Sequence, residues 1–207
     1  MKTKYFVLII ILFLNGVNMA QVKNTIANNA EDVCPIKIGT EIHNAIVRTL
    51  DDKEISIKKI TAGQKSLIIF YRGGWCPYCN LHLSELQTIE NELVNLGYKL
   101  IAISMDKPEN LTATIDKQNL KYELYSDSKA NACKEFGIAF KVENEYVNKL
   151  KGFNMDIEAS AGEKHHILPV PSVFLIDENG IVKFEYVNPN YKERINAKLL
   201  LEAAKIY

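Results

Sequence analysis

The chain has 207 residues, of which 47% are hydrophobic, and this is enough for one substantial buried core. Its 25 basic residues balance 25 acidic ones, and no cluster of Lys and Arg forms a stripe that could neutralise a run of phosphates. A single domain is therefore expected, and nucleic acid is excluded as a partner.

The first 20 residues have the layout of a secretory signal peptide. Lys2 and Lys4 precede the apolar run 6–14, and the segment ends at Ala20. The apolar run is much shorter than the ~20 residues that a membrane-spanning helix needs. We therefore expect cleavage after Ala20, no permanent membrane anchor, and export to the periplasm or the extracellular space.

A polar segment over 21–33 is expected to be a flexible lead, and one domain over 34–207 follows it. Residues 46–61 alternate apolar and polar side chains around a turn at Asp51 and predict a pair of short strands. The continuous apolar run 67–71 predicts a strand that is covered on both faces. From Pro77 to Leu96 leucines recur at near-helical spacing, and Gly97 is the expected end of this helix.

The second half of the chain continues the alternation of strands and helices. Its patterns predict strands at 98–104 and 123–125, helices at 108–119 and 128–136, and a longer excursion over 138–166 with a helical patch at 146–150. Strands at 173–176 and 181–186 flank a turn and predict a hairpin. A helix over 197–206, capped by Asn196, ends the chain. This order indicates an α/β fold with a central mixed sheet flanked by helices.

A C-x-x-C pair, Cys76 and Cys79, lies where the strand 67–71 turns into an amphipathic helix. Unpaired backbone N–H groups and the helix dipole stabilise a thiolate at a helix N-terminus, so the pKa of Cys76 is expected to fall below the free value of ~8.5. Pro77 suits the first helical turn, where its missing N–H costs nothing. We expect Cys76 to be the exposed attacking sulfur and Cys79 its more buried partner in a redox-active disulfide.

Two other uses of the cysteine pair stay open. A structural disulfide across two intervening residues would constrain the unfolded chain very little. A zinc site could use His82 as a third ligand, but no second C-x-x-C or H-x-x-H follows to complete four ligands. We therefore expect neither a bound metal nor a cofactor. Cys34 and Cys133 are expected to be isolated buried or half-buried thiols.

A C-x-x-C at a strand-to-helix turn, a proline before the next-to-last strand and a hairpin after it resemble the thioredoxin superfamily, and the motifs at 70–79, 165–171 and 186–191 are matches to one branch of it. Within it, the stretch from about Cys34 to Tyr207 resembles the peroxiredoxin-like branch of the alkyl hydroperoxide reductase and thiol-specific antioxidant proteins. The resemblance implies a thioredoxin-like fold and a thiol-dependent antioxidant oxidoreductase that reduces hydroperoxides through its cysteine pair. It also implies a thioredoxin-like reductant, and it implies that Pro171 is a cis proline facing the cysteines.

The positions of the cysteines in the family motif and the helix geometry assign different roles to Cys76 and Cys79. In typical peroxiredoxins a Phe-Tyr pair precedes a threonine and, three residues later, the peroxide-reacting cysteine. Here Cys76 stands at the position of the threonine and Cys79 at that of the cysteine. Family members also carry an arginine beside the last strands that polarises the peroxide, and Arg72 is the only local substitute. Disulfide exchange led by Cys76, acting on protein disulfides, therefore competes with peroxide reduction by Cys79.

Three further side chains have candidate roles near the pair. Trp75 is expected to shield the sulfurs and to dock a partner. His165 and His166 are expected to be solvated loop residues, and the alternative is that one of them lies near the sulfurs as a proton carrier or metal ligand. A copper-binding thioredoxin-fold module remains a further reading because soft thiolates favour Cu(I). Copper-delivery relatives, however, place one more residue between their cysteines.

Overall fold

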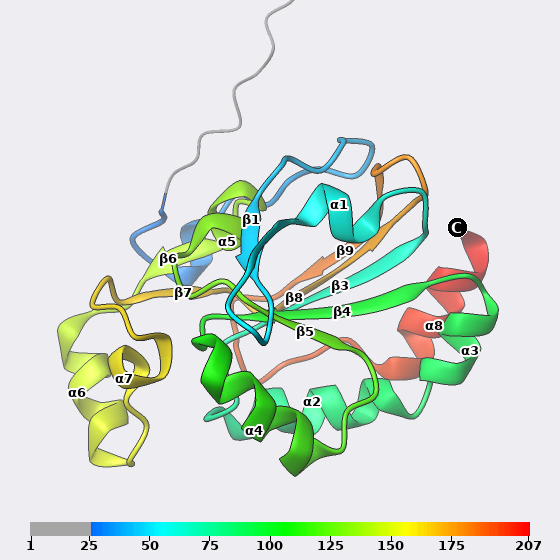
Figure 1. The fold of residues 1–207 in the computed structure, drawn as a ribbon. Coiled ribbons are helices and arrows are strands. Elements are labelled where there is room, and N and C mark those ends of the chain that lie inside the picture. Colours follow the sequence, from blue (N-terminus) through cyan, green and yellow to red (C-terminus); the bar gives the residue numbers. More distant parts are fainter. Residues whose placement is uncertain (1–25) are drawn as a thin grey trace, which may run out of the picture.

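The computed structural model describes residues 26–207, so the expected signal peptide lies outside the described residues. A seven-stranded mixed sheet of order β2-β1-β5-β4-β3-β8-β9 forms the centre of the molecule (Figure 1). A two-stranded sheet of β6 and β7 lies beside it. The strands are β1 (Ile46–Arg48), β2 (Glu54–Ser56), β3 (Ser66–Tyr71), β4 (Lys99–Ser104), β5 (Glu123–Ser126), β6 (Ala139–Lys141), β7 (Ile167–Pro169), β8 (Ser172–Ile176) and β9 (Val182–Val187).

Helices cover both faces of the large sheet. Residues of α2, α3, α4 and α8 pack into one apolar cluster, and residues of α1, α5, α6 and α7 pack into the other. The expected fold class is thereby confirmed. The helices are α1 (Ile57–Thr61), α2 (Pro77–Gln87), α3 (Glu90–Asn95), α4 (Pro108–Gln118), α5 (Asn131–Glu135), α6 (Asn144–Gly152), α7 (Ile157–Ala161) and α8 (Ala197–Ile206), and a short 3₁₀ turn spans Ala30–Asp32.

Strand β3 lies inside the sheet, between β4 and β8, and carries the cysteine turn at its end. It pairs in parallel with β4 and antiparallel with β8, and all six of its residues are buried. Leu67, Ile69 and Tyr71 belong to the cluster that contains the cysteine pair, whereas Ile68 and Phe70 belong to the opposite cluster. Because successive side chains of a strand point to opposite faces, a strand covered on both sides is apolar at every position. The prediction for 67–71 is confirmed.

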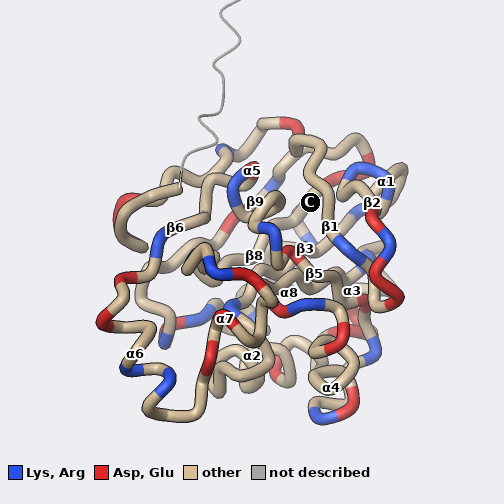
Figure 2. The backbone as a smooth tube through the Cα atoms, turned by 60° about the vertical axis from the view of Figure 1, so that its left-hand side comes forward, with Lys and Arg blue, Asp and Glu red and all other residues tan. Residues whose placement is uncertain are grey.

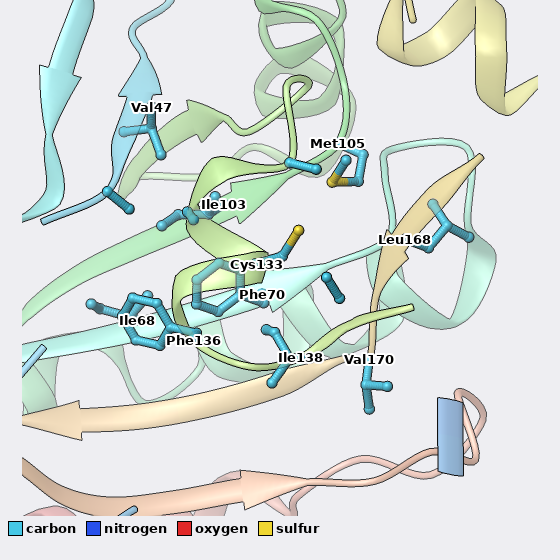
Figure 3. Packing of buried hydrophobic residues seen from close by; sticks show 14 of the residues in the cluster. Val47, Ile68, Phe70, Ile103, Met105, Cys133, Phe136, Ile138, Leu168 and Val170 are labelled. Carbon is cyan, nitrogen blue, oxygen red and sulfur yellow. The ribbon is translucent and has the colours of Figure 1, made fainter. Parts of the chain in front are cut away.

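Aromatic packing fixes the end of β3 from the side opposite the cysteines. The Phe70 ring packs against the Phe136 ring (Figure 3), with 4.8 Å between the ring centroids. The centroid of the Phe174 ring lies 6.1 Å from that of Phe70. All three rings are essentially inaccessible to solvent. The strand that leads into the cysteine turn is therefore held rigidly.

Two predicted elements differ from the observed ones in ways that have a local cause. Residues 57–61 form α1 rather than part of a strand, because the Ser56 hydroxyl accepts a hydrogen bond from the Lys59 N–H and so caps a helix. The expected helix from 77 to 96 is divided into α2 and α3, and the break falls at Thr88 and Ile89. The other strands of the large sheet, the hairpin and the Asn196-capped last helix agree with the predictions, whereas β6, β7 and α7 were not predicted.

The excursion over 138–166 forms a small substructure of its own. It contains β6, α6 and α7, and β6 pairs antiparallel with β7. Part of the expected lead also contacts this region, since the Ala27 N–H donates to the Ala139 carbonyl and the Ala27 carbonyl accepts from the Lys141 N–H. Positive and negative residues are interspersed along the chain (Figure 2). Within residues 26–207, none of the helices has the length and apolar character needed to cross a bilayer.

Candidate active site

The turn between β3 and α2 requires two glycines. Gly73 has a φ of +155°, and a Cβ there would lie 2.3 Å from the Trp75 Nε1 atom. A Cβ on Gly74 would lie 2.0 Å from the Thr114 Oγ1 atom of α4. The Gly74 N–H donates to the Asp106 carboxylate over 2.6 Å, which fastens the turn to the end of β4. Close packing around the turn therefore sets the positions of the two cysteines that follow it.

The cysteines occupy the first turn of α2, as the sequence predicts. Cys76 is the N-cap residue, Pro77 is the first helical residue, and Cys79 lies on the buried face of the helix. Both are free thiols, and their Sγ atoms are 2.7 Å apart, with Cys79 donating to Cys76. A disulfide bond measures ~2.05 Å. The sulfurs are thus placed to form a disulfide without rearrangement of the helix.

The expectation that Cys76 is exposed is wrong. Only 1% of Cys76 and 0% of Cys79 is accessible. The connection between β9 and α8, residues 188–196, packs over this end of α2. Its Tyr191 ring lies 5.7 Å from that of Tyr78, one of the two residues between the cysteines, and Arg194 reaches Cys79. Contacts from a segment more than a hundred residues away carry no signal in the local motif, which explains the error.

The surroundings of the two thiols shift their pKa values in opposite directions. The hydrogen bond from Cys79 lowers the pKa of Cys76 to about 6, with help from the positive charge of Arg72 and against the effect of burial. Burial raises the pKa of the Cys79 thiol well above its usual range, and the neighbouring Cys76 raises it further. Cys76 is therefore the thiolate and Cys79 its hydrogen-bond donor.

Arg72 contributes a buried positive charge beside the pair. It is 3% exposed, and its guanidinium lies 4.9 Å from the Trp75 ring, 5.7 Å from the Tyr146 ring and 4.3 Å from the Tyr191 ring. It also donates to the Tyr146 hydroxyl over 3.2 Å. Among residues 26–207, no carboxylate lies within ion-pair distance of Arg72. Aromatic faces hold this cation by cation–π attraction and leave its charge free to act on the thiolate.

Two functional candidates were missed by the sequence analysis. Arg194 Nη2 lies 3.6 Å from the Cys79 Sγ atom, so Arg72 is not the only arginine at the site. Asp106 is buried, and burial raises its pKa to about 7 despite the hydrogen bond from Gly74. Asp106 directly follows a predicted strand, which is a weak signal for a site residue. Arg194 lies in a loop with no motif of its own.

The Pro171 prediction needs a correction. Every peptide bond in the described residues is trans, including the one before Pro171. An X–Pro bond favours trans by only about 0.5–1 kcal/mol, so the surrounding chain decides the isomer. Here the Val170 N–H pairs with the Ile138 carbonyl, and β8 begins immediately after the proline.

The loop histidines have partners away from the sulfurs. His165 Nε2 lies 2.7 Å from the Ser128 carbonyl oxygen, and His166 contacts Asn144 and Glu158. Both rings are half-buried rather than solvated. His82 of α2 is buried, and burial together with the charge of Arg194 lowers its pKa to about 4. In the described part of the chain, no three His, Cys, Asp or Glu side chains are grouped to hold a metal ion.

The remaining cysteines stand apart from this site. Cys133 is buried in α5, and Cys34 is exposed, so the expectation of a buried or half-buried thiol holds only for Cys133. A cavity of about 240 Å³ opens beside Trp75, between the cysteine turn and α4. Asp106, Asn110 and Lys117 are among its lining residues, whereas neither Cys76 nor Cys79 lines it.

Comparison with known proteins finds one matching family and relatives that are thiol-dependent redox proteins. The model of the AhpC/TSA family matches residues 38–185. Peroxiredoxin Bcp of Escherichia coli is 29% identical over 104 residues, which is 50% of this chain and 66% of that protein. The thiol-disulfide oxidoreductase ResA of Bacillus thuringiensis is 22% identical over 165 residues, covering 79% of this chain and 78% of that protein.

Solved structures with a similar fold cover most of the chain. Reduced Prx3 of Vibrio vulnificus in complex with H₂O₂ has a TM-score of 0.67 at 21% identity, and covers 82% of this chain and 99% of its own. Peroxidoxin BcpB of Mycobacterium tuberculosis has a TM-score of 0.64 at 13% identity, with coverages of 83% and 97%. At these identities the likeness establishes a thioredoxin-like, peroxiredoxin-type fold.

Proposed function

Because the chain belongs to the AhpC/TSA family, a family of thiol-dependent oxidoreductases, we propose that it reduces hydroperoxides with Cys76 as the attacking thiolate and Cys79 as the resolving thiol. One observation carries this assignment. The Cys79 Sγ donates to the Cys76 Sγ over 2.7 Å, and this bond lowers the pKa of Cys76 to about 6. A thiolate is the nucleophilic form of cysteine, and most of Cys76 is in that form at neutral pH.

The reaction has three steps. The Cys76 thiolate attacks one peroxide oxygen, the O–O bond breaks, and the departing alkoxide or hydroxide takes a proton to leave as alcohol or water. Cys79 then attacks the sulfenic acid sulfur of Cys76, the S–O bond breaks, and water leaves as the disulfide forms. A thioredoxin-like dithiol reduces this disulfide by thiol–disulfide exchange and becomes a disulfide itself, and this step requires the 188–196 connection to move away from the buried sulfurs.

Burial of the pair favours a small oxidant. Cys76 is 1% exposed, so a protein disulfide has no direct approach to its sulfur unless the 188–196 connection moves. Hydrogen peroxide is little larger than a water molecule and needs a much smaller opening. The Escherichia coli relative is a peroxiredoxin, and the Vibrio vulnificus neighbour was solved in complex with H₂O₂; both support the same substrate class.

This assignment reverses the family register, which puts peroxide attack on Cys79. Exposure to excess H₂O₂ and trapping of sulfenic acid with dimedone separate the two. We expect Cys76→Ser to lose fast thiol oxidation, and Cys79→Ser to undergo one oxidation that stops as a trapped Cys76 sulfenic acid. Cys34→Ser is the control and should behave as the wild type. Fast oxidation retained by Cys76→Ser and lost by Cys79→Ser would restore the family register, and no oxidation in any form would reject peroxidase activity.

Exchange with protein disulfides is the second candidate, and one observation favours it. Tyr78 and Leu81 of α2 are 41% and 61% exposed beside the pair, which gives a partner protein an apolar surface to dock against. The ResA relative is named a thiol-disulfide oxidoreductase. Turnover of a scrambled protein substrate that depends on Cys76 and exceeds the rate of peroxide reduction would place this function first.

We also propose that residues 1–20 direct export and that the mature chain begins near Gln21 in the periplasm or outside the cell. The charged start and the short apolar run support this. Intact-mass measurement of the exported protein tests it, and a membrane-bound species that retains residues 1–20 would reject it.

A further inference from the structure

The connection between β9 and α8, residues 188–196, brings a second guanidinium to the cysteine pair. Arg194 Nη2 lies 3.6 Å from the Cys79 Sγ atom, within hydrogen-bonding range of sulfur. Its other terminal nitrogen, Nη1, donates to the carbonyl oxygens of Tyr191 and Glu193. These local bonds fix the plane of the guanidinium, so its position does not depend on the sulfur.

The charge of Arg194 is not neutralised nearby. Within residues 26–207, none of the ion pairs involves Arg194, and its buried Nε atom has no hydrogen-bond partner. A guanidinium carries five N–H donors, so at least one directed donor remains available after the carbonyl contacts. Arg194 also lowers the pKa of buried His82, which shows that its positive charge acts on this face of α2.

The proposed reaction needs such a group at Cys79 rather than at Cys76. The Cys76 thiolate already has the Cys79 donor and the charge of Arg72. Cys79 is fully buried, yet its sulfur must carry negative charge when it attacks the sulfenic acid and again when it leaves the disulfide. Burying an unpaired charge is costly unless a donor meets it. Among the described residues, Arg194 provides the one side-chain nitrogen that donates to Cys79 Sγ.

We propose that Arg194 is a catalytic residue of the resolving half-reaction, in which its guanidinium stabilises the Cys79 thiolate. The inference rests on the proposed function and gives the two arginines different main partners. Arg72 acts chiefly on Cys76, on which Arg194 has a smaller effect, and Arg194 alone of the two reaches the Cys79 sulfur with a guanidinium nitrogen. In disulfide formation, the Cys79 thiolate attacks the Cys76 sulfur, and hydroxide leaves and is protonated to water. In reduction, a dithiol attacks Cys76 and the Cys79 thiolate departs, paired with Arg194.

The test compares Arg194→Met, Arg194→Lys and the control Lys192→Met, which removes an exposed positive charge from the same connection. After mixing with H₂O₂, dimedone trapping reports sulfenic acid and quantification of free thiols reports the disulfide. A hydrogen bond to a charged group accounts for about a 10- to 100-fold change in rate. Arg194 is the smallest of the influences that lower the pKa of Cys76, so Arg194→Met should form sulfenic acid at close to the wild-type rate. It should close the disulfide about 10- to 100-fold more slowly, so that sulfenic acid accumulates. Arg194→Lys should be intermediate, and Lys192→Met should match the wild type.

A second experiment tests the role of Arg194 without depending on peroxidase activity. The disulfide is formed chemically with diamide in each protein, and its opening by dithiothreitol is followed. Arg194→Met should open more slowly than Lys192→Met by a similar factor. If the wild type forms no sulfenic acid but this difference is present, the proposed function fails while the role of Arg194 stands. Wild-type rates of both disulfide closure and opening in Arg194→Met would overturn the inference, as would equal slowing in Lys192→Met. Should Arg194→Met not fold, wild-type rates in Arg194→Lys and Arg194→Gln would overturn it in the same way.

Discussion

Replacing Cys79 with Ala should raise the pKa of Cys76, because it removes the donor that stabilises the thiolate. The Cys79 Sγ lies 2.7 Å from the Cys76 Sγ, and this hydrogen bond is the largest influence on the Cys76 thiol, whose pKa is lowered to about 6. The charge of Arg72 remains in the variant and continues to lower the pKa. Cys79→Ser keeps a hydroxyl donor at the same position and is the matched comparison.

The size of the effect follows from the strength of the lost bond. A hydrogen bond to a charged group contributes about 1.5–3 kcal/mol, and ~1.36 kcal/mol corresponds to one pH unit. We therefore expect the pKa of Cys76 to rise by about 1 to 2 pH units in Cys79→Ala and by less in Cys79→Ser. At pH 7, Cys76 would change from mainly thiolate to a half or less in that form.

Alkylation by iodoacetamide measures this directly, since only the thiolate reacts. The rate at Cys76 is followed by peptide mass spectrometry against pH, in a Cys34→Ser background that removes the exposed thiol. Burial slows the reaction at every pH but leaves the midpoint of the curve unchanged. An equal or lower midpoint in Cys79→Ala than in the parent would refute the assignment of Cys79 as the donor to a Cys76 thiolate.

Three further predictions concern the frame of the site. Burial raises the pKa of Asp106 to about 7 from its usual 3.8, so the folded state binds the proton more tightly. The contribution of Asp106 to stability should be fully present below about pH 4 and be lost as the pH rises to about 7, and chemical denaturation should show a flatter profile over this range for Asp106→Asn. Gly74→Ala places a Cβ 2.0 Å from the Thr114 hydroxyl oxygen and should cost about 1–3 kcal/mol, whereas Gly152→Ala, with nothing within 4 Å, should be neutral in the same denaturation assay. Phe136→Ala empties the space between two aromatic rings and should cost about 3–5 kcal/mol, and a loss below about 1 kcal/mol would show that the ring cluster is not a rigid support for β3.

The fold was largely predictable because its central strands are covered on both faces. The apolar runs at 67–71 and 173–176 are short, continuous and contain aromatic and β-branched residues, which favours buried strands over helices. The Asp177 turn between β8 and β9 defines the hairpin. The errors lie where a single hydrogen bond or a short pairing decides the structure. Ser56 caps α1 in a stretch that alternates like a strand, and three-residue strands such as β7 are too short to produce a pattern.

The site was predictable only for residues that lie close together in the sequence. Cys76, Cys79, Trp75 and Arg72 lie within one motif, and the structure brings all four together. The cover over the sulfurs and the contact of Arg194 depend on how the segment after β9 docks, and no periodicity in the sequence encodes that docking. The cis isomer expected for Pro171 rested on the resemblance alone, and the bond before Pro171 is trans.

The cover over the cysteines has a consequence for the newly made chain. Arg194 lies 115 positions after Cys79, so during synthesis the cysteine turn emerges well before the segment that encloses it. Until α8 docks and draws the 188–196 connection over α2, both sulfurs are open to any oxidant or thiol in their surroundings. The first oxidation state of the pair is therefore set by the compartment in which folding begins. Only the completed fold, with its last helix in place, can select what reaches Cys76.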